Sequence, residues 1–392
     1  MNLKNEIDKS YKDMTPEERA LYKEKRKKKN LMIAYFRRGV ALIIVLAVVI
    51  IIIAIVKLHS SKSVDSSNND EVAIEEDSSD YISSTDSNGL KISDKKDEVS
   101  GEDNNSDNSA EDADDTSSSN SLYYANETSS TESITSDNCI SQYAIVINND
   151  SKEVIATKSA YEKMIPASMT KVMTVYSAVK RIDESQLDEI VTMSNEAISY
   201  SYAHGCSTSG FVEGEEVTVR DLLYGTILPS GGDAACQLAM YVAGDVDSFM
   251  ELVNDDLEEL GISDTTHFTN PIGYYDEEHY STCYDIAIIM MAAMDNEILS
   301  EVLSTHVYQS SASNVNAEGI TLSNWFLRRI EDKEFGGTIY CAKTGFVNQS
   351  GNCAVSSEIS DSGTTYICVT GNATSSWRAI YDHVELYTLY GN

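Results

Sequence analysis

The sequence predicts an α/β domain whose antiparallel sheet is built from both ends of the domain, is flanked by helices and carries a mostly helical inserted subdomain. A transmembrane helix and a disordered tether are expected to precede it. An uncharged apolar run covers residues 39–56, and a segment rich in Ser, Asp, Asn and Glu covers residues 58–137. Residues 138–392 then show strand-like patterns at both ends and helical periodicity in the middle, which suits a sheet assembled from both ends.

The apolar run has the length of a membrane-spanning helix. It holds 18 residues, and residues 1–38 before it carry 12 Lys and Arg against 6 Asp and Glu, a net charge of +6. Because basic residues mark the cytoplasmic side, we expect residues 1–38 in the cytoplasm and everything after Lys57 outside the cell. A cleaved secretory signal has a similar plan, but this run is too long and lacks a small-residue cleavage pattern. We therefore expect an uncleaved single-pass anchor in the cell membrane over residues 39–57.

The segment after the anchor is predicted to be a tether. Residues 58–137 carry 21 acidic residues against 4 basic ones and show no hydrophobic periodicity, so we expect them to be disordered. A flexible chain of this length has a root-mean-square span of roughly 50 Å. It would hold an extracellular domain of residues 138–392 away from the membrane.

The composition of residues 138–392 excludes several partners. This region has 36 acidic and 12 basic side chains, so it lacks the basic footprint that nucleic acid and anionic lipid headgroups require. The six histidines of the chain are scattered singly without metal-ligand spacing, so we expect neither a metal site nor a cofactor.

The seven cysteines do not require a disulfide framework, because their number is odd and no C-x-x-C spacing occurs. Cys341, Cys353 and Cys368 fall in neighbouring strand candidates, so one bridge among them stays open. Buried thiols are the simpler interpretation.

The first elements of this region are a hairpin and a buried helix. "QYAIVINNDSKEVIATKS", residues 142–159, alternates apolar residues on either side of an Asn-Asn-Asp turn, as β-hairpins do. After Pro166, apolar residues recur every three and four positions as far as Val179, which predicts a mostly buried helix. Further helical patterns cover residues 218–244, 246–261 and 284–294.

The last elements return to β structure. Short β-rich segments lie at residues 336–345, 352–359 and 364–372, and a helical pattern over 377–390 closes the chain. A cleft between a sheet and a helical insertion is a common place for a site.

The pattern S-x-x-K, a candidate nucleophile with its base, begins at Ser93, Ser168 and Ser177. Ser93 lies in the predicted tether, and the other two point to opposite sides of one helix because they are nine positions apart. Ser168 lies in the first turn, where free N–H groups and the helix dipole favour negative charge on its oxygen. Lys171, three residues later, can reach that hydroxyl. Spacing alone favours an ordinary serine at a helix start over a nucleophile, so other segments have to decide.

Two further segments select Ser168. "PSGGDAAC" places Ser230 in a turn directly before a helix, and "AKTGF" places Lys343, Thr344 and Gly345 at the end of a strand, where glycine lets a backbone approach a ligand. Each segment alone is weak, because the first is also a good helix cap and the second also an ordinary strand end. The order of the three segments along the chain is what indicates that Ser168 is the nucleophile.

"PASMTK", "PSGGDAA" and "KTG", in this order, resemble the three motifs of penicillin-binding serine enzymes, which share a fold with class A β-lactamases. Over roughly residues 140–390 the chain is similar to low-molecular-mass D-alanyl-D-alanine carboxypeptidases of the peptidase S11 type. The resemblance implies a β-lactamase/transpeptidase-like fold and a serine hydrolase acting on peptidoglycan stem peptides that end in D-Ala-D-Ala. It also implies covalent inhibition by β-lactam antibiotics.

The resemblance implies catalytic roles for three residues. Ser168 would be the nucleophile, and Lys171 its base. Lys171 would have to be unprotonated, through partial burial and the nearby positive charge of Lys343. Ser230, which lies between two lysines in this family, would relay a proton to the departing D-alanine.

Substrate-binding roles follow from the same resemblance. Lys343 and Thr344 would hold the terminal carboxylate of the substrate. The backbone N–H groups of Ser168 and of Phe346, the residue after Gly345, would form the oxyanion hole. Arg378 in the last helix is a candidate second cation for the carboxylate, although capping or a surface ion pair explains an arginine there equally well.

The sequence departs from the family pattern in two respects. Gly232 stands where the middle motif normally has Asn, which removes an amide able to orient the lysine. A water or a neighbouring backbone group would substitute at some loss, since such a hydrogen bond contributes about 0.5–1.5 kcal/mol. The chain also ends just after the last helix, so we expect the N-terminal membrane helix to replace the C-terminal amphipathic anchor of many relatives.

Two other functions stay open. A β-lactamase also needs a glutamate on a loop to activate the deacylating water, and the nearest candidate, Glu251, lies in an amphipathic helical pattern. The other is a protein that binds stem peptides without turnover, with Gly232 as the mark of lost activity.

Overall fold

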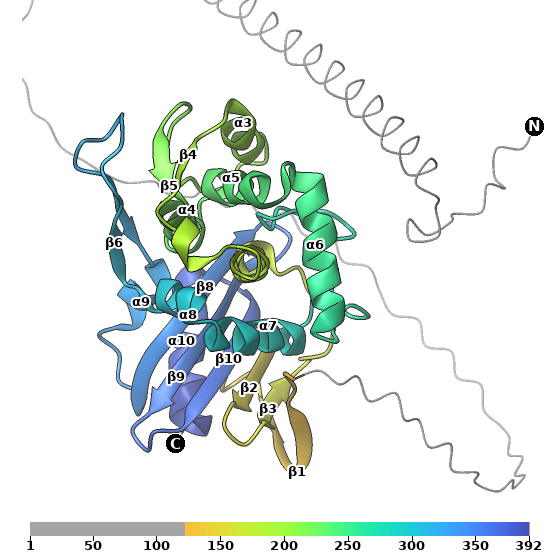
Figure 1. Cartoon of the computed structure of the whole chain (residues 1–392). Helices are drawn as coiled ribbons and strands as arrows, with labels where there is room; N and C mark the ends of the chain where they lie inside the picture. The colour runs from red at the N-terminus through yellow and green to blue at the C-terminus, as the bar shows by residue number, and fades with distance from the viewer. Residues whose placement is uncertain (1–121, 392) are drawn as a thin grey trace, which may run out of the picture. The chain divides into compact units, whose positions relative to one another are not determined.

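The computed structural model describes residues 122–391, which form the domain coloured in Figure 1. The predicted cytoplasmic segment, the predicted transmembrane helix and most of the predicted tether lie outside the described residues. Within residues 122–391, no helix combines the length and the apolar composition needed to cross a membrane.

A six-stranded sheet in the order β1-β3-β2-β10-β9-β8 forms the centre of the domain. The strands are β1 Asn126–Ser133, β2 Tyr143–Asn148, β3 Glu153–Lys158, β8 Gly337–Val347, β9 Gly351–Ser360 and β10 Thr365–Ala373. The predicted assembly from both ends of the domain is confirmed, because β2 pairs with β10. The sheet is mixed rather than antiparallel throughout, since β1 runs parallel to β3.

The segment between β3 and β8 is mostly helical, as predicted. Its helices are α2 Thr170–Val179, α3 Asn195–Ala203, α4 Val219–Ile227, α5 Gly232–Ala243, α6 Val246–Glu259, α7 Cys283–Asp295, α8 Glu297–Ser304 and α9 Trp325–Ile330, and α10 Ser376–Tyr390 follows β10. The 3-10 turns η2 Ala167–Met169 and η3 Glu184–Gln186 belong to the same segment, as do the short strand pairs β4 Ile190–Thr192 with β5 Glu216–Thr218 and β6 Val307–Gln309 with β7 Thr321–Ser323.

The strand β1 corrects the predicted boundary at residue 138. Its sequence "NETSSTES" is almost entirely exposed and has no alternating apolar side chains, so the pattern did not indicate a strand. Backbone pairing forms it instead, with Asn126 opposite Glu153 and Ser133 opposite Thr157 on β3. The last residues of the predicted disordered tether are therefore part of the folded domain.

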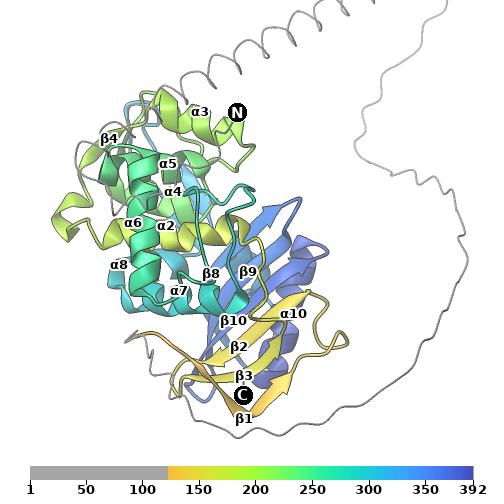
Figure 2. The same cartoon turned by 90° about the vertical axis from the view of Figure 1, so that its right-hand side faces the viewer.

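Each face of the sheet has its own core, because successive strand residues point to opposite sides. On one face, Val355 and Val369 join the core formed with α2 and α7. On the other face, Ala354 and Cys368 pack with α9 and α10. Figure 2 shows the resulting layers, with α10 on one side of the sheet and α7 and α8 on the other.

All seven cysteines are free thiols in the structure, of which six are buried and Cys206 is half-buried. Cys341 and Cys353 belong to the core under α7, whereas Cys368 belongs to the opposite core. These side chains therefore contribute to packing.

Glu358 on β9 is a buried carboxyl group without a hydrogen-bond partner. Its side chain is fully buried, and neither of its oxygens is bonded within the described residues. It fills space left by Gly337 and Gly391, since a Cβ added at either position would collide with the carboxyl group. Burial, with a smaller contribution from the charge of Asp361, raises the pKa of Glu358 from 4.5 to about 8.

We expect Glu358→Gln to stabilise the domain increasingly as the pH rises from about 5 to about 8. The folded protein keeps this proton up to about pH 8, whereas the unfolded chain loses it near pH 4.5. The wild type therefore loses up to about 1.4 kcal/mol of unfolding free energy per pH unit over this interval, and the glutamine variant does not. Urea unfolding at the two pH values measures the difference.

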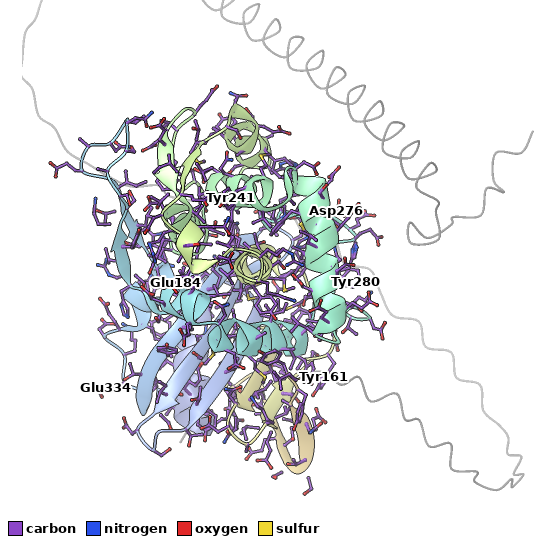
Figure 3. The ribbon with its side chains drawn as sticks, in the orientation of Figure 1. Tyr161, Glu184, Tyr241, Asp276, Tyr280 and Glu334 are labelled. Carbon is purple, nitrogen blue, oxygen red and sulfur yellow. The ribbon has the colours of Figure 1, made fainter. Side chains whose placement is uncertain are left out.

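The matched control for this prediction is Glu334→Gln, which changes an exposed carboxylate at the edge of the molecule (Figure 3). Its effect should be small at both pH values. A stability change for Glu358→Gln that does not depend on pH would contradict the prediction.

Candidate active site

Ser168 lies at the entry of α2, on the short turn η2 that follows Pro166. The preceding residue, Ala167, has a left-handed backbone with φ of 48°, which is costly for a residue with a side chain. Two glycines make room for this turn. A Cβ at Gly273 would collide with the carbonyl oxygen of Ala167, and one at Gly345 would lie 3.0 Å from the backbone nitrogen of Ser168. Segments remote in sequence therefore close around the serine.

The side chain of Lys171 reaches back to the serine hydroxyl. Its Nζ donates to Oγ of Ser168 over 3.1 Å and to the carbonyl oxygen of Ile272 over 2.7 Å. Lys171 is fully buried, and burial lowers the pKa of its ammonium group from 10.5 to about 8. Near neutral pH a fraction of this lysine is therefore uncharged, which is the state that can accept the serine proton.

A second buried lysine meets a second serine. Nζ of Lys343 on β8 donates to Oγ of Ser230 over 2.9 Å and to the carbonyl oxygen of Thr344 over 2.8 Å. Burial, together with the positive charge of Lys171, holds the pKa of Lys343 well below 10.5. Ser230 has φ of 64° in the connection between α4 and α5, so its hydroxyl is also placed by an unusual backbone conformation.

One pocket of about 280 Å³ joins the two pairs. Of the predicted site residues, it is lined by Ser168, Ser230, Thr344, Gly345 and Phe346. The folding of the chain thus brings together Ser168 and the strand of Lys343, which are 175 positions apart in the sequence.

The structure does not bring Arg378 into this pocket. Its Nε and Nη2 both lie 2.8 Å from Oδ1 of Asp382, one turn later on α10. Asp382 also accepts hydrogen bonds from the backbone N–H groups of Ile140 and Ser141. The ion-pair interpretation of Arg378 therefore fits the geometry, and the expected contact with a substrate carboxylate does not.

Arg329 on α9 is a cation that does line the pocket, together with Trp325 from the same helix. The sequence pattern did not single out either residue, because α9 has only six residues and belongs to none of the three motifs.

A buried polar network holds the loop that supplies the Ile272 carbonyl. Oδ1 of Asn270 accepts from the backbone N–H of Gly273 over 2.7 Å. Nε2 of the buried His279 lies 2.8 Å from the hydroxyl of Thr170 on α2, and Nδ1 lies 3.2 Å from Nδ2 of Asn270. Burial lowers the pKa of His279 to about 3, so the ring is neutral. The sequence pattern missed this network, because its members are ordinary polar residues without a characteristic spacing.

Neighbouring side chains occupy the space that a side chain at position 232 would need. A Cβ at this position would lie 2.5 Å from Oγ of Ser201 and 2.9 Å from Cβ of Cys206, so the space for a side chain is already filled. Lys171 donates to the carbonyl oxygen of Ile272. The lysine therefore has a polar partner besides Ser168 without an amide at position 232.

We expect Gly232→Asn to impair the protein rather than to restore the family motif. Ser201 and Cys206 must move to admit the new side chain, and overpacking of this kind costs about 1–3 kcal/mol. The unfolding free energy should fall by this order, and acylation by penicillin should slow. Ala203→Asn is the control, since Ala203 is exposed at the end of α3 and an asparagine there meets no packed neighbour. Faster acylation in Gly232→Asn without loss of stability would contradict the prediction.

The mixed sheet, the helical insertion and the serine with its lysine three residues later define a class: the serine enzymes of the DD-peptidase, penicillin-binding fold. The sequence model of the peptidase S11 family, described as D-alanyl-D-alanine carboxypeptidase, matches residues 128–375. The chain belongs to this family, which confirms the resemblance drawn from the three motifs.

Curated relatives are similar over part of their length. The chain is 29% identical over 216 residues to the D-alanyl-D-alanine carboxypeptidase DacF of Bacillus subtilis strain 168, covering 55% of this chain and 53% of the relative. It is 32% identical over 184 residues to DacD of Escherichia coli K12, covering 46% of each. The chain thus spans about half the length of these curated relatives.

Solved structures match over about two thirds of the chain. The Streptomyces K15 DD-transpeptidase superposes with a TM-score of 0.58 at 29% identity, covering 66% of this chain and 99% of that one. The D-alanyl-D-alanine carboxypeptidase of Mycobacterium tuberculosis H37Rv gives a TM-score of 0.55 at 25% identity, covering 64% and 89%.

Proposed function

We propose that this chain is a membrane-anchored serine-type D-Ala-D-Ala carboxypeptidase that trims the terminal D-alanine of peptidoglycan stem peptides through an acyl-enzyme on Ser168. One observation carries the proposal. Ser168 and Ser230 line the same pocket. Ser168 accepts a hydrogen bond of 3.1 Å from Lys171, and Ser230 accepts one from Lys343. Membership of the peptidase S11 family supports the same reaction.

In the first step, neutral Lys171 would take the proton of the Ser168 hydroxyl. At the same time, Oγ of Ser168 would bond to the carbonyl carbon of the penultimate D-alanine. The carbonyl oxygen then carries negative charge. The backbone N–H groups of Ser168 and Phe346 would stabilise it, and the close packing of Gly345 against the nitrogen of Ser168 supports this arrangement.

In the second step, the bond between that carbonyl carbon and the nitrogen of the terminal D-alanine would break. The departing amine needs a proton, and the Ser230 hydroxyl, bonded to Lys343 over 2.9 Å, would relay to it the proton that Lys171 took from Ser168. Water would then attack the ester on Ser168, release the shortened peptide and restore the free hydroxyl. The net reaction consumes one water and releases one D-alanine.

The position of β8 suggests how the substrate lies. β8 is an edge strand of the described sheet, and an extended peptide can add to such an edge through its backbone. Lys343 and Thr344 on this strand would then hold the terminal carboxylate. Arg329, rather than Arg378, is the arginine that lines this pocket.

The location is part of the proposal. The basic flank of residues 1–38 and the apolar run of 18 residues after it support a single-pass helix in the cell membrane with the N-terminus in the cytoplasm. The catalytic domain would then lie outside the cell, where peptidoglycan and β-lactam antibiotics are accessible. Protease added to intact cells should remove the domain and leave the N-terminal segment protected.

One experiment separates the three candidate functions. The chain is incubated with a labelled penicillin and, separately, with a peptide ending in D-Ala-D-Ala. A carboxypeptidase retains the label and releases D-alanine, a β-lactamase destroys the penicillin and retains little label, and a binding protein does neither. The exposed position of Glu251 on α6, outside the pocket lining, favours the first outcome over the second.

A further inference from the structure

A surface of exposed aromatic side chains continues from the pocket along α9 and α10. The chain has two tryptophans and both lie here, with Trp325 56% exposed and Trp377 46% exposed. Trp325 lines the pocket, whereas Trp377 lies beyond it. Phe326 and Ile380 belong to the buried core that holds the two helices together, which leaves the indoles outside. Exposed aromatic side chains gathered beside a site are typical of a binding surface.

Arg329 lies between the two indoles. Its guanidinium carbon is 5.7 Å from the ring centroid of Trp325 and 5.4 Å from that of Trp377, so cation–π contacts hold it in place. The ring of Tyr381 stacks on that of Trp377 with centroids 6.0 Å apart. We call Trp325, Arg329, Trp377 and Tyr381 the aromatic shelf.

The charges around the aromatic shelf are nearly balanced. The ion pairs are Arg328 with Glu331, Lys333 with Asp332 and Arg378 with Asp382. Within residues 122–391, Arg329 has no carboxylate partner, so its N–H groups are available to a ligand. A polyanion would be expected to meet several free cations. Lys333, already paired with Asp332, also lies 5.8 Å from the ring centroid of Trp377. Exposed indole rings with one unpaired guanidinium between them suit an uncharged ligand that has apolar C–H faces and many oxygen acceptors.

We propose that the aromatic shelf binds the glycan backbone of peptidoglycan. Sugar rings would stack on the indoles of Trp325 and Trp377, and hydroxyl or acetamido oxygens would accept hydrogen bonds from Arg329. This inference rests on the proposed function and makes it more specific. The preferred substrate is then polymeric peptidoglycan, held by its glycan, rather than a free stem peptide.

Intrinsic fluorescence tests the binding directly, because the full-length chain has no tryptophan outside the shelf. We expect a peptide-free β-1,4-linked N-acetylglucosamine oligomer to change the emission of the full-length Ser168→Ala protein in a saturable way. The change should depend little on salt, since the ligand is uncharged. Trp377→Ala should weaken the binding about tenfold. The control Tyr161→Ala removes an aromatic residue that is 49% exposed elsewhere on the surface and should bind normally (Figure 3).

Activity measurements distinguish this inference from the proposed function. With Ser168 intact, Trp377→Ala should release D-alanine from a soluble peptide as the wild type does, but about fivefold or more slowly from isolated cell walls. Three results would overturn the glycan site. Trp377→Ala and the wild type would release D-alanine from cell walls at the same rate, Trp377→Ala would lose the same activity on walls and on the soluble peptide, or the oligomer would leave the tryptophan emission unchanged. If the protein binds an anionic peptide in a salt-sensitive way and does not bind the oligomer, the aromatic shelf is a peptide-binding surface instead. Absence of D-alanine release by the wild type on both substrates would overturn the proposed function, while saturable binding of the oligomer would still support the shelf.

Discussion

Replacing Ser168 by alanine is expected to abolish both covalent labelling by penicillin and release of D-alanine. The hydroxyl is the group bonded to Lys171 over 3.1 Å, and its oxygen is the atom that would join the substrate carbonyl. Without it no acyl-enzyme forms, so the rate should fall by about 10⁴-fold or more. The fold should survive, because the change removes one half-buried oxygen. Gel detection of labelled penicillin and an assay for free D-alanine measure the two losses.

The chain supplies a matched control in Ser177→Ala. Ser177 begins another S-x-x-K pattern on the same helix, but it is fully buried and does not line the pocket. This variant should keep both the label and the D-alanine release. Retention of the label by Ser168→Ala, or its loss in a folded Ser177→Ala, would place the nucleophile elsewhere.

The rate of acylation is expected to rise with pH up to about pH 8 and then to level off. Lys171 can accept a proton only when neutral, and burial lowers its pKa to about 8. Below this pKa the neutral fraction grows about tenfold for each pH unit, and above it the neutral form predominates. The second-order rate constant for penicillin, measured from about pH 6 to about pH 9, should follow this curve.

Lys171→Arg should remove this pH dependence together with most of the activity. A guanidinium group stays protonated over the whole range, so it cannot act as a base, and general-base catalysis contributes about 10²–10⁴-fold. The matched control is Lys180→Arg, which ends the other S-x-x-K pattern and forms ion pairs with Asp256 and Glu259. A pH-independent wild type, or an unchanged profile in Lys171→Arg, would assign the base to another group.

Sequence patterns predicted the elements that bury a regular apolar face. The hairpin of β2 and β3, the helix after Pro166, the strands β8 to β10 and the final helix α10 all lie where periodicity placed them. β1 escaped prediction because backbone pairing forms it, and its side chains are exposed. α8 and α9 were missed because eight and six residues are too few for a clear helical period.

The sequence by itself determined the family, the placement of Ser168 and Lys171 on one helix turn, and the strand that carries Lys343, because local spacing and motif order record these features. Only the tertiary structure decided which remote groups complete the site. The tertiary structure places the carbonyl oxygen of Ile272 within hydrogen-bond distance of Lys171. It also places Arg329, rather than Arg378, at the pocket. The reason is physical: a backbone carbonyl has no residue-specific signature, and the direction of an arginine depends on how its helix packs on the sheet.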